Sequence, residues 1–541
     1  MTVTDTPAEQ FAATADSLNH QLRPATAHRG ARALALRTEL ANADFLGGSP
    51  QQIDNGDEAR YADKSGTYTK GVLQQGIGLV DLAAYESFKH ALASGDPADF
   101  ANIVLGGPRT LNGPQGGLAF SLDSADSGHF SVPPAPALAS EAYATELVEM
   151  YWASLLRDVA FTDYRTNATA VKAAAELTTL PSYAGPRDTG GAVTPELLFR
   201  GRFAGDTTGP YLSQFMVQPT TLGSLPITQR YHTNKAGVDF MLNDSEYLKV
   251  QNGQPTGKKL NQLAPLRYLH DGRGLAAYTH ADVLYQAYFI AYLVLNTINA
   301  GNPVPLNPGN PYATGHPAAK TQNGFASLGQ PDIAATLAAV ADEALKAVWY
   351  QKWWVHLRHR PESGGAIVHL LKTGQGGSIQ GHVSDTALNS QAVASSFAAN
   401  NSYFLAQAFP EGSPAHPAYP TGHGTVAGAC ITVLKFFFDG NFVITNPVVS
   451  SPDGTSTTPY MAPAGEAPLT VNGELNKLAN NVSFGHGVHA GIHWRSDTET
   501  SIELGEAVAL SYLRERARTY NEQFTVSLTK LDGSIATISN P

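Results

Sequence analysis

Five stretches of this chain place apolar residues every three to four positions, the period of a helix that buries one face. In the first stretch, Leu147, Tyr151 and Leu155 would share one side of a helix. The stretch 280–300 is apolar nearly all round, which is typical of a helix buried in a core. The sequence therefore predicts a mostly α fold, with helices over Glu141–Phe161, His280–Ala300, Asp332–His356, Thr425–Phe438 and Ala490–Arg518.

The segments between these helices are rich in proline and glycine, and we expect Asn302–Gln322 and Val448–Pro468 to be long loops. Near the end of the chain, Asp532-Gly533 lies between alternating apolar residues, which predicts a short β-hairpin over Phe524–Ile538. The first 80 residues are polar and mixed. We interpret residues 1–80 as an arm that wraps the body or a partner subunit, and residues 81–541 as one large all-α domain.

Composition and charge exclude several classes of function. The net charge is −11 and the chain has no long basic run, so a nucleic-acid partner is not expected. The best membrane candidate, Ala287–Ile298, is shorter than the roughly 20 apolar residues of a spanning helix. The N-terminus shows no secretory signal and the single cysteine, Cys430, cannot form an internal disulfide. We therefore expect a cytoplasmic protein, with Cys430 a buried structural residue rather than a nucleophile.

Cationic and aromatic residues are concentrated in the segment Gln351–Pro361. Lys352 and Arg360 are eight positions apart, which would place them two turns apart on one face of a helix that Pro361 stops. Two fixed cations on one face suit the binding of an oxyanion. The alternative is a basic helix end that interacts with the helix dipole.

A second segment, Thr421-Gly422-His423-Gly424, leads directly into an apolar helix. The first backbone N–H groups of a helix have no partner within it and bind anions well. Thr421 adds a hydroxyl, His423 adds an imidazole, and His416 lies seven positions earlier. The alternative interpretation is an ordinary capped turn.

A third segment contains His486, His489 and His493, spaced three and four positions apart. These side chains would share one face if the segment were helical throughout. A zinc triad is one interpretation, although no acidic or cysteine ligand accompanies it at a familiar spacing. Histidines scattered over the core and surface are the other.

In this order the three segments resemble those of the vanadium-dependent haloperoxidases and the related acid phosphatases. The matching residues are Lys352 with Arg360-Pro361, then Pro420-Thr421-Gly422-His423, then Gly491-Ile492-His493-Trp494-Arg495. The resemblance implies an all-α helical-bundle fold with its site in residues 350–500. It also implies that vanadate is bonded to His493, that His423 is the acid–base residue, and that His416 lies near a halide pocket. The remaining vanadate contacts would come from Lys352, Arg360, Thr421, the Gly422 amide and His423.

The sequence departs from the family pattern at two positions. Thr421 stands where the family has serine, which adds a methyl group. The family also has an arginine six residues before the closing histidine, and here that position is Gly487. His486 would take the arginine's place if the register shifts by one residue. Losing one partner from a desolvated charged cluster typically costs about 2–5 kcal/mol, so vanadate binding should suffer.

The motif wording most resembles a bacterial branch of the family from meroterpenoid pathways. That branch includes chloroperoxidases and vanadate-independent relatives that rearrange α-hydroxyketone naphthoquinones by a 1,2-acyl shift. Because of Gly487, our first hypothesis is such a rearrangement of a prenylated aromatic, without a cofactor. His423 or His493 would act as the base, and Lys352 and Arg360 would stabilise the developing oxyanion.

Several alternatives stay open at this point. The first is a vanadate-dependent chloroperoxidase or bromoperoxidase in which His486 or Arg495 replaces the arginine. Phosphomonoester hydrolysis and a non-enzymatic scaffold are others. Aromatic residues near the motifs would line the substrate pocket or belong to the core, and we favour the core; they are Trp353, Trp354, Tyr403, Phe404 and Trp494. From the family we also expect a homodimer.

Overall fold

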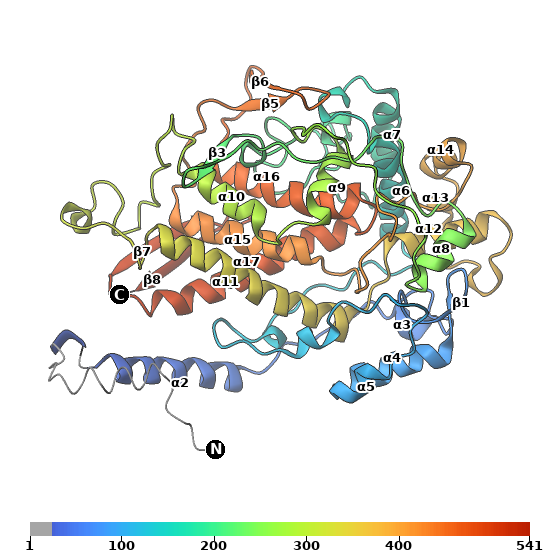
Figure 1. The fold of residues 1–541 in the computed structure, drawn as a ribbon, viewed down its shortest axis with the longest axis horizontal. Helices are drawn as coiled ribbons and strands as arrows, with labels where there is room; N and C mark the ends of the chain where they lie inside the picture. The colour runs from blue at the N-terminus through green and yellow to red at the C-terminus, as the bar shows by residue number, and fades with distance from the viewer. Residues whose placement is uncertain (1–23, 27, 541) are drawn as a thin grey trace. The chain divides into compact units, whose positions relative to one another are not determined.

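The computed structural model of the protein describes residues 24–26 and 28–540, and it is mostly helical (Figure 1). The longer helices are α2 (Arg29–Gly47), α4 (Leu82–Ser94), α6 (Glu141–Leu156), α7 (Ala168–Thr179), α8 (Asp244–Gln251), α9 (Gly272–His280), α10 (Gln286–Leu295), α11 (Gln330–Tyr350), α12 (Pro361–Lys372), α14 (Gln391–Asn400), α15 (Gly422–Phe437), α16 (Val471–Phe484) and α17 (Arg495–Ala517). Three are short: α3 (Asp57–Arg60), α5 (Pro97–Ala101) and α13 (Asp385–Leu388). Two further segments, η8 (Gln351–His356) and η10 (Gly485–His489), are π-helical.

Short 3-10 turns and two-stranded antiparallel hairpins connect the helices. The 3-10 turns are η1 (Pro24–Thr26), η2 (Pro114–Leu118), η3 (Ser127–His129), η4 (Phe161–Asp163), η5 (Pro195–Leu197), η6 (Gln214–Met216), η7 (Pro317–Lys320) and η9 (Gly377–Ile379). The hairpins pair β1 (Gln74–Gly76) with β2 (Leu79–Val80), β3 (Thr220–Leu222) with β4 (Leu225–Ile227), β5 (Val448–Ser450) with β6 (Thr457–Pro459), and β7 (Phe524–Thr529) with β8 (Ile535–Asn540).

The chain divides into two units, Met1–Ser49 and Pro50–Pro541. The described part of the first unit consists of η1 and α2, and α2 buries none of its residues. The sequence placed the boundary at residue 80, whereas residues 50–80 belong to the second unit. There Lys70 is buried and its ammonium group lies 2.7 Å from the Glu362 carboxylate of α12.

Helix α15 forms the centre of the larger hydrophobic core, and every one of its residues is buried. It packs against α10, α11, α16 and α17, and Figure 1 shows α11, α15 and α17 side by side. Glycines allow α15 and α17 to touch through their backbones. A Cβ on Gly428 would lie 1.9 Å from the Ile502 carbonyl oxygen, and one on Gly505 would lie 2.0 Å from that of Thr425. This close packing fixes the start of α15 against the start of α17.

A second hydrophobic core surrounds α6, which packs against α7, α12, α13 and α14. The segments that carry the three sequence motifs leave or enter helices where the two cores meet. The first motif joins α11 to α12, the second precedes α15, and the third joins α16 to α17. The two bundles therefore bring the motifs together although up to 140 residues separate them in the sequence.

The mostly α prediction is confirmed, and so is the C-terminal hairpin, in which Gly533 takes a left-handed φ of 82° between β7 and β8. Two element predictions were wrong. The helix expected over His280–Ala300 is shorter than predicted, because α10 spans only Gln286–Leu295 and His280 is the last residue of α9. The expected loop Val448–Pro468 contains the β5–β6 hairpin. Cys430 is buried, as predicted.

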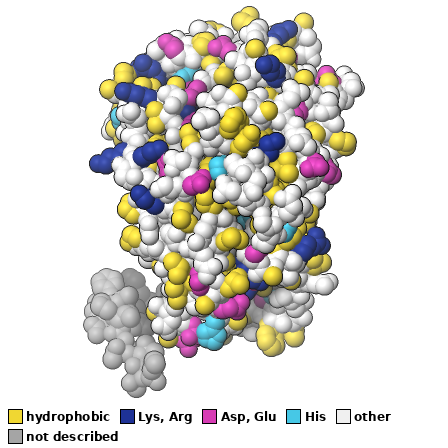
Figure 2. Space-filling view, turned by 90° about the vertical axis from the view of Figure 1, so that its right-hand side faces the viewer, with side chains coloured by type: hydrophobic (Ala, Val, Ile, Leu, Met, Phe, Trp, Pro, Cys, Tyr) yellow, Lys and Arg dark blue, Asp and Glu magenta, His cyan; other side chains and the backbone are white. Residues whose placement is uncertain are grey.

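Two surface properties bear on partners. Among the described residues, none of the helices combines the length and apolar character needed to cross a bilayer. On the face drawn in Figure 2, Lys and Arg side chains are interspersed with Asp, Glu and apolar groups. The described part of that face therefore gathers no continuous basic surface of the kind that binds nucleic acid.

Candidate active site

Lys352 and Arg360 lie in different elements, and both donate hydrogen bonds to backbone carbonyls of the segment 416–418. Lys352 lies in the π-helical turn η8, and its Nζ donates to the carbonyl oxygens of Pro417 at 2.8 Å and Ala418 at 2.9 Å. Arg360 is the N-cap of α12, and its Nε donates to the His416 carbonyl at 2.9 Å. The segment 416–418 thus holds both cations in place.

The expectation that these two residues share one helix was wrong. The helix ends at His356, because Leu357 adopts a left-handed φ of 44°. Pro361 then begins the next helix rather than stopping the first, which suits a residue that lacks an N–H and has a helical φ. The turn between the helices, not a helical face, aims Arg360 toward the motif residues.

Both cations are buried and neither forms an ion pair with a carboxylate of the described chain. Burial lowers the pKa of Lys352 well below its usual value, and the neighbouring Arg360 charge lowers it further. Burial likewise lowers the pKa of Arg360 to about 10. Two buried positive groups that have only neutral partners favour binding of an anion between or beside them.

His493 is held with one nitrogen toward a carboxylate and the other toward Arg360. Its Nδ1 lies 3.0 Å from Asp497 Oδ2, and Arg358 Nη1 donates to the other oxygen of Asp497 at 2.6 Å. A carboxylate partner places the proton on Nδ1, so Nε2 presents its lone pair. Arg360 Nη1 donates to that Nε2 at 2.7 Å. Burial, followed by the charges of Arg360 and Lys352, lowers the pKa of His493 well below its usual value, which keeps the imidazole neutral.

Thr421 is the N-cap of α15, but its hydroxyl does not cap the helix. The hydroxyl oxygen is buried and makes no hydrogen bond with the described chain. Its methyl group lies beside Gly424, where an added Cβ would approach Thr421 Cγ2 to 2.8 Å. The same Cβ would lie 1.9 Å from Ser501 Oγ and 2.7 Å from Ser483 Oγ, so three neighbours together require glycine at this position. The amides of Gly422 and His423 follow in the first helical turn, where N–H groups lack helical partners.

His423 is held between a carboxylate and a second imidazole. Its Nε2 lies 3.0 Å from Oδ1 of Asp282, in the segment between α9 and α10. The His486 ring stacks on it, with centroids 3.6 Å apart and planes inclined by 24°. His486 also lies 5.5 Å from the His493 ring, and its Nδ1 is buried without a hydrogen-bond partner in the described chain. Burial lowers the pKa of His486, and the neighbouring His423 and His493 lower it further.

The side chain that enters the cluster from this segment is His486, because position 487 has no room for one. A Cβ on Gly487 would lie 2.9 Å from His493 Cβ and 2.9 Å from Thr498 Cγ2. The π-helical turn η10 supplies the one-residue shift, since it adds a residue to a helical turn. Arg495 is directed elsewhere: its guanidinium pairs with Glu149 at 2.5 Å and Glu499 at 2.8 Å.

The zinc interpretation of the three histidines was wrong. His489 lies on the opposite side of η10, where its Nε2 is 2.9 Å from the hydroxyl of Tyr211. The expected common face does not form because the segment is π-helical and then turns at Gly491. Within the described residues, no group of three or more His, Cys, Asp or Glu side chains could hold a metal ion.

His416 lies in the wall beside Arg360, whose Nη2 donates to His416 Nδ1 at 3.0 Å. Its other neighbour is the Trp349 ring, with centroids 4.9 Å apart. The structure thus brings together every residue that the sequence suggested for the site: Lys352, Arg360, His416, Thr421, Gly422, His423 and His493. Sequence reasoning missed the roles of Asp282 and Trp349, because neither belongs to a motif and only the tertiary fold brings them here.

The fold and this cluster define a helical-bundle protein in which two buried cations and a helix N-terminus, groups that suit an oxyanion, lie beside a neutral histidine. A family model of the VCPO second helical-bundle domain matches residues 332–522. Vanadium-dependent bromoperoxidases of Corallina officinalis and Ascophyllum nodosum are each 31% identical to this chain, over 92% and 94% of its length and 94% and 92% of theirs. The solved structure of the homohexameric second vanadate-dependent bromoperoxidase of Ascophyllum nodosum superposes with a TM-score of 0.87 at 27% identity, covering 96% of this chain and 91% of that one. The chain therefore belongs to the vanadium haloperoxidase family.

The residues present fit a vanadate ion. The pocket offers two cations that lack carboxylate partners, a buried hydroxyl and a buried imidazole nitrogen that lack hydrogen bonds, and the free amides at the start of α15. An oxyanion would satisfy these groups at once. His493 would be the ligand, through the Nε2 that Asp497 leaves unprotonated. Arg360 Nη1, which donates to that nitrogen in this structure, would then donate to the oxyanion instead.

Proposed function

We propose that this chain is a vanadate-dependent haloperoxidase that oxidises bromide with hydrogen peroxide. The observation that carries the proposal is the pair of buried cations beside His493. Lys352 and Arg360 have no carboxylate partner among the described residues, and Arg360 Nη1 lies 2.7 Å from the His493 Nε2. The bromoperoxidase relatives support the choice of reaction. Bound vanadate would supply a Lewis acid that activates the peroxide toward attack by the halide.

Each residue of the chain then has a distinct task. Lys352 and Arg360 neutralise the oxyanion, and the Thr421 hydroxyl donates to it. Asp497 orients His493 and fixes the proton on its Nδ1. His423, whose Nε2–H donates to Asp282, has its Nδ1 free to take or give the proton that peroxide must lose. Trp349 and His416 form an aromatic wall beside Arg360, where a weakly hydrated halide would be stabilised.

The test is bromination of a simple acceptor, monochlorodimedone, by purified protein with orthovanadate, peroxide and bromide. We expect turnover that depends on vanadate and is lost in His493→Ala. His232→Ala, which removes an exposed histidine, should keep the turnover and serves as the matched control. Absence of vanadate-dependent turnover, in folded protein that retains no vanadium after desalting, would refute the proposal.

A cofactor-free rearrangement is the second candidate function. The observation that favours it is the position of the His486 ring between His423 and His493. If this imidazole takes the place of the family's arginine, the site has one permanent positive charge fewer, and Lys352 and Arg360 are its cations. In this case His423 would take the hydroxyl proton of an α-hydroxyketone, and the two cations would stabilise the enolate-like oxygen during a 1,2-acyl shift. The substrate would be a prenylated naphthoquinone of a meroterpenoid pathway. It ranks second because the relatives described above are algal bromoperoxidases.

We also propose that the chain associates with copies of itself. Within the first unit, Leu34, Phe45 and Leu46 of helix α2 are 68%, 86% and 79% exposed, and burying such side chains against another copy would be favourable. One relative is described as homohexameric. Light scattering should therefore show a dimer or larger assembly that Phe45→Lys with Leu46→Lys weakens, whereas Met461→Lys, an exposed methionine of the second unit, leaves it intact. A monomer in the unmodified chain would contradict the proposal.

A further inference from the structure

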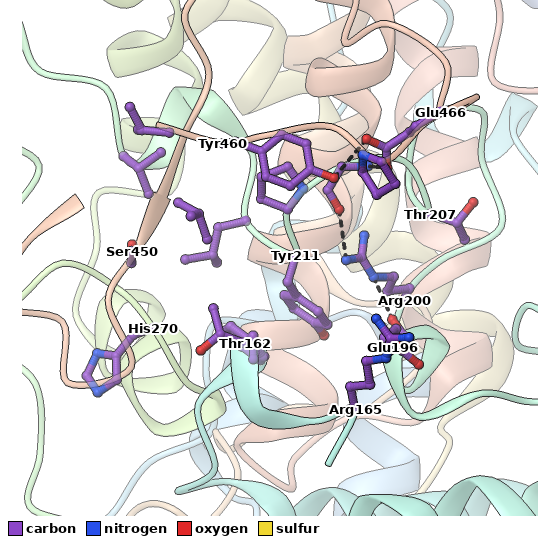
Figure 3. Close-up of a pocket in the computed structure, with 18 of the residues that line it drawn as sticks. Thr162, Arg165, Glu196, Arg200, Thr207, Tyr211, His270, Ser450, Tyr460 and Glu466 are labelled. Carbon is purple, nitrogen blue, oxygen red and sulfur yellow. Dashed lines mark hydrogen bonds and ion pairs between the residues drawn. The ribbon is translucent and has the colours of Figure 1, made fainter. Parts of the chain in front are cut away.

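A cavity outside the candidate active site is lined by Phe161, Arg200, Tyr211 and Tyr460 among others, and Figure 3 shows its lining. Its volume is about 360 Å³, which is within the range of pockets that bind small organic ligands. The connection between the two sites is short: Tyr211 in the cavity wall bonds to His489, and His486 on the same π-helical turn stacks on His423. The residues of the candidate active site do not line this cavity.

The walls of the cavity are largely apolar and aromatic. Phe161 and Tyr211 are stacked, with ring centroids 3.7 Å apart and planes inclined by 7°. Leu212 and Val448 extend this surface, and Figure 3 shows Tyr460 facing Tyr211 across the cavity. A slot between aromatic rings selects a flat, apolar ligand body.

Arg200 supplies a charged group at one end of the slot. It is 8% exposed, and it donates to three backbone carbonyls: Glu196 at 2.9 Å, Asp206 at 2.8 Å and Gly209 at 3.1 Å. A guanidinium carries five N–H donors, so these bonds leave two of them unused. In the described chain Arg200 forms no ion pair with a carboxylate, and burial lowers its pKa. Besides these carbonyls, its guanidinium lies over the Tyr211 ring, 5.1 Å from the ring centroid. A buried cation without a carboxylate partner is stabilised by an anion.

The acidic side chains of the cavity already have partners. Glu196 pairs with Arg165 at 3.4 Å. Glu466 accepts hydrogen bonds from the Gly209 amide at 2.9 Å and from the Tyr460 hydroxyl at 2.7 Å. Among the described residues that line the cavity, the buried cation without a carboxylate partner is therefore Arg200.

We propose that this cavity binds a planar aromatic carboxylate, with its ring between Tyr460 and the Phe161–Tyr211 pair and its carboxylate on Arg200. The ligand would bury its apolar body and give Arg200 the counter-ion that the protein does not provide. The proposal does not depend on the reaction at the vanadate pocket.

The test uses 2-naphthoate as the probe in calorimetric titration of the full chain. We expect binding that is at least about tenfold tighter than that of the uncharged 2-naphthamide, since a charge-assisted hydrogen bond is worth a factor of this size. Thr162→Trp places a large side chain at the exposed rim of the cavity and should abolish this binding. Thr166→Trp, in the same turn but outside the cavity lining, is the matched control and should leave it unchanged.

Two further variants separate this cavity from the vanadate pocket. Arg200→Gln should weaken 2-naphthoate binding and leave 2-naphthamide binding unchanged. Because Arg200 also anchors three carbonyls, Thr162→Trp remains decisive if that variant fails to fold. Lys352→Ala should leave 2-naphthoate binding intact. Loss of 2-naphthoate binding in Lys352→Ala but not in Thr162→Trp would show that the carboxylate binds in the vanadate pocket, and would overturn the proposal. Equal affinity for 2-naphthoate and 2-naphthamide would also overturn it.

Discussion

The imidazole rings of His423 and His486 lie face to face, 3.6 Å between centroids. His423 is tied to Asp282 on its other side, and His486 approaches His493. His486 therefore lies between His423, the proposed acid–base residue, and His493, the proposed vanadate ligand. In the sequence, His486 is one position before Gly487, where the family pattern has its arginine. We propose that His486 stands where the family has arginine, and the side chain is buried in the cluster.

Restoring a guanidinium at this position should strengthen vanadate binding. His486→Arg would add a permanent positive charge and several donors next to the His493 Nε2. We expect orthovanadate to bind at least about tenfold more tightly, because a charged hydrogen bond to an oxyanion is worth a factor of this size or more. The dissociation constant, measured by equilibrium dialysis with vanadium analysis, checks the prediction.

The control for this change is His232→Arg, which adds the same charge at an exposed position of the second unit. It should leave the affinity unchanged. Equal or weaker vanadate binding in His486→Arg would show that His486 does not stand in the arginine's place.

Removing the charge of Asp497 should cost vanadate affinity through His493 rather than through direct contact. Asp497→Asn weakens the acceptor of the His493 Nδ1–H and leaves Arg358 with Glu146 as its remaining carboxylate partner. Loss of such a supporting carboxylate typically reduces metal affinity or activity about 10- to 100-fold. We expect a loss of this size in vanadium content after desalting.

Helix α17 offers a matched control for that substitution. Glu503 forms an exposed ion pair with Arg202, and such pairs contribute little to stability. Glu503→Gln should keep the vanadium content of the unmodified chain. If Asp497→Asn also kept it, Asp497 would have no part in orienting His493.

The order of the three motifs was sufficient to predict the fold class and the residues that meet in the pocket, because each motif follows or precedes a strongly periodic helix. The local path of the chain could not be predicted in the same way. Lys352 and Arg360 have a helical spacing, yet the left-handed Leu357 separates them into two helices. A π-helical turn leaves no trace in hydrophobic periodicity, so the register that admits His486 was left open.

Sequence patterns also could not predict contacts between segments that are far apart in the chain. Asp282 is one polar residue beside an apolar stretch, and only the break between α9 and α10 turns it toward His423. Gly424 looks like part of a Gly-rich turn, but its missing Cβ makes room for α17, because a Cβ there would lie 1.9 Å from Ser501 Oγ. Both are consequences of packing between helices that are far apart in the chain.

Asp206 should make the stability of the protein depend on pH. Burial raises the pKa of its carboxyl from 3.8 to about 7. The folded chain then binds a proton that the unfolded chain has lost, so this stabilisation is present at low pH and is lost as pH rises toward 7. Between pH 5 and pH 7 the contribution should fall by about 2 kcal/mol, because the slope of 1.36 kcal/mol for each pH unit decreases as the pH approaches the folded pKa.

The variant that checks this is Asp206→Asn, which keeps an acceptor for the Phe203 amide but cannot ionise. Its melting temperature relative to the unmodified chain should increase from pH 5 to pH 7 and then level off. A difference that is constant across this range would show that Asp206 ionises alike in both states.

Thr421 allows the hydroxyl and the methyl group of one side chain to be tested separately. Thr421→Ser removes the methyl beside Gly424 and keeps the donor, so vanadate affinity should change little. Thr421→Val keeps the shape and removes the hydroxyl, and vanadate affinity should fall about tenfold or more, because a hydrogen bond to a charged acceptor is lost. Without vanadate the hydroxyl is buried with no hydrogen-bond partner in the described chain, so Thr421→Val should leave the melting temperature unchanged or raise it. The vanadate affinity and the melting temperature of both variants check this prediction. A lower melting temperature with unchanged vanadate affinity in Thr421→Val would mean that the hydroxyl stabilises the fold and does not bind the oxyanion.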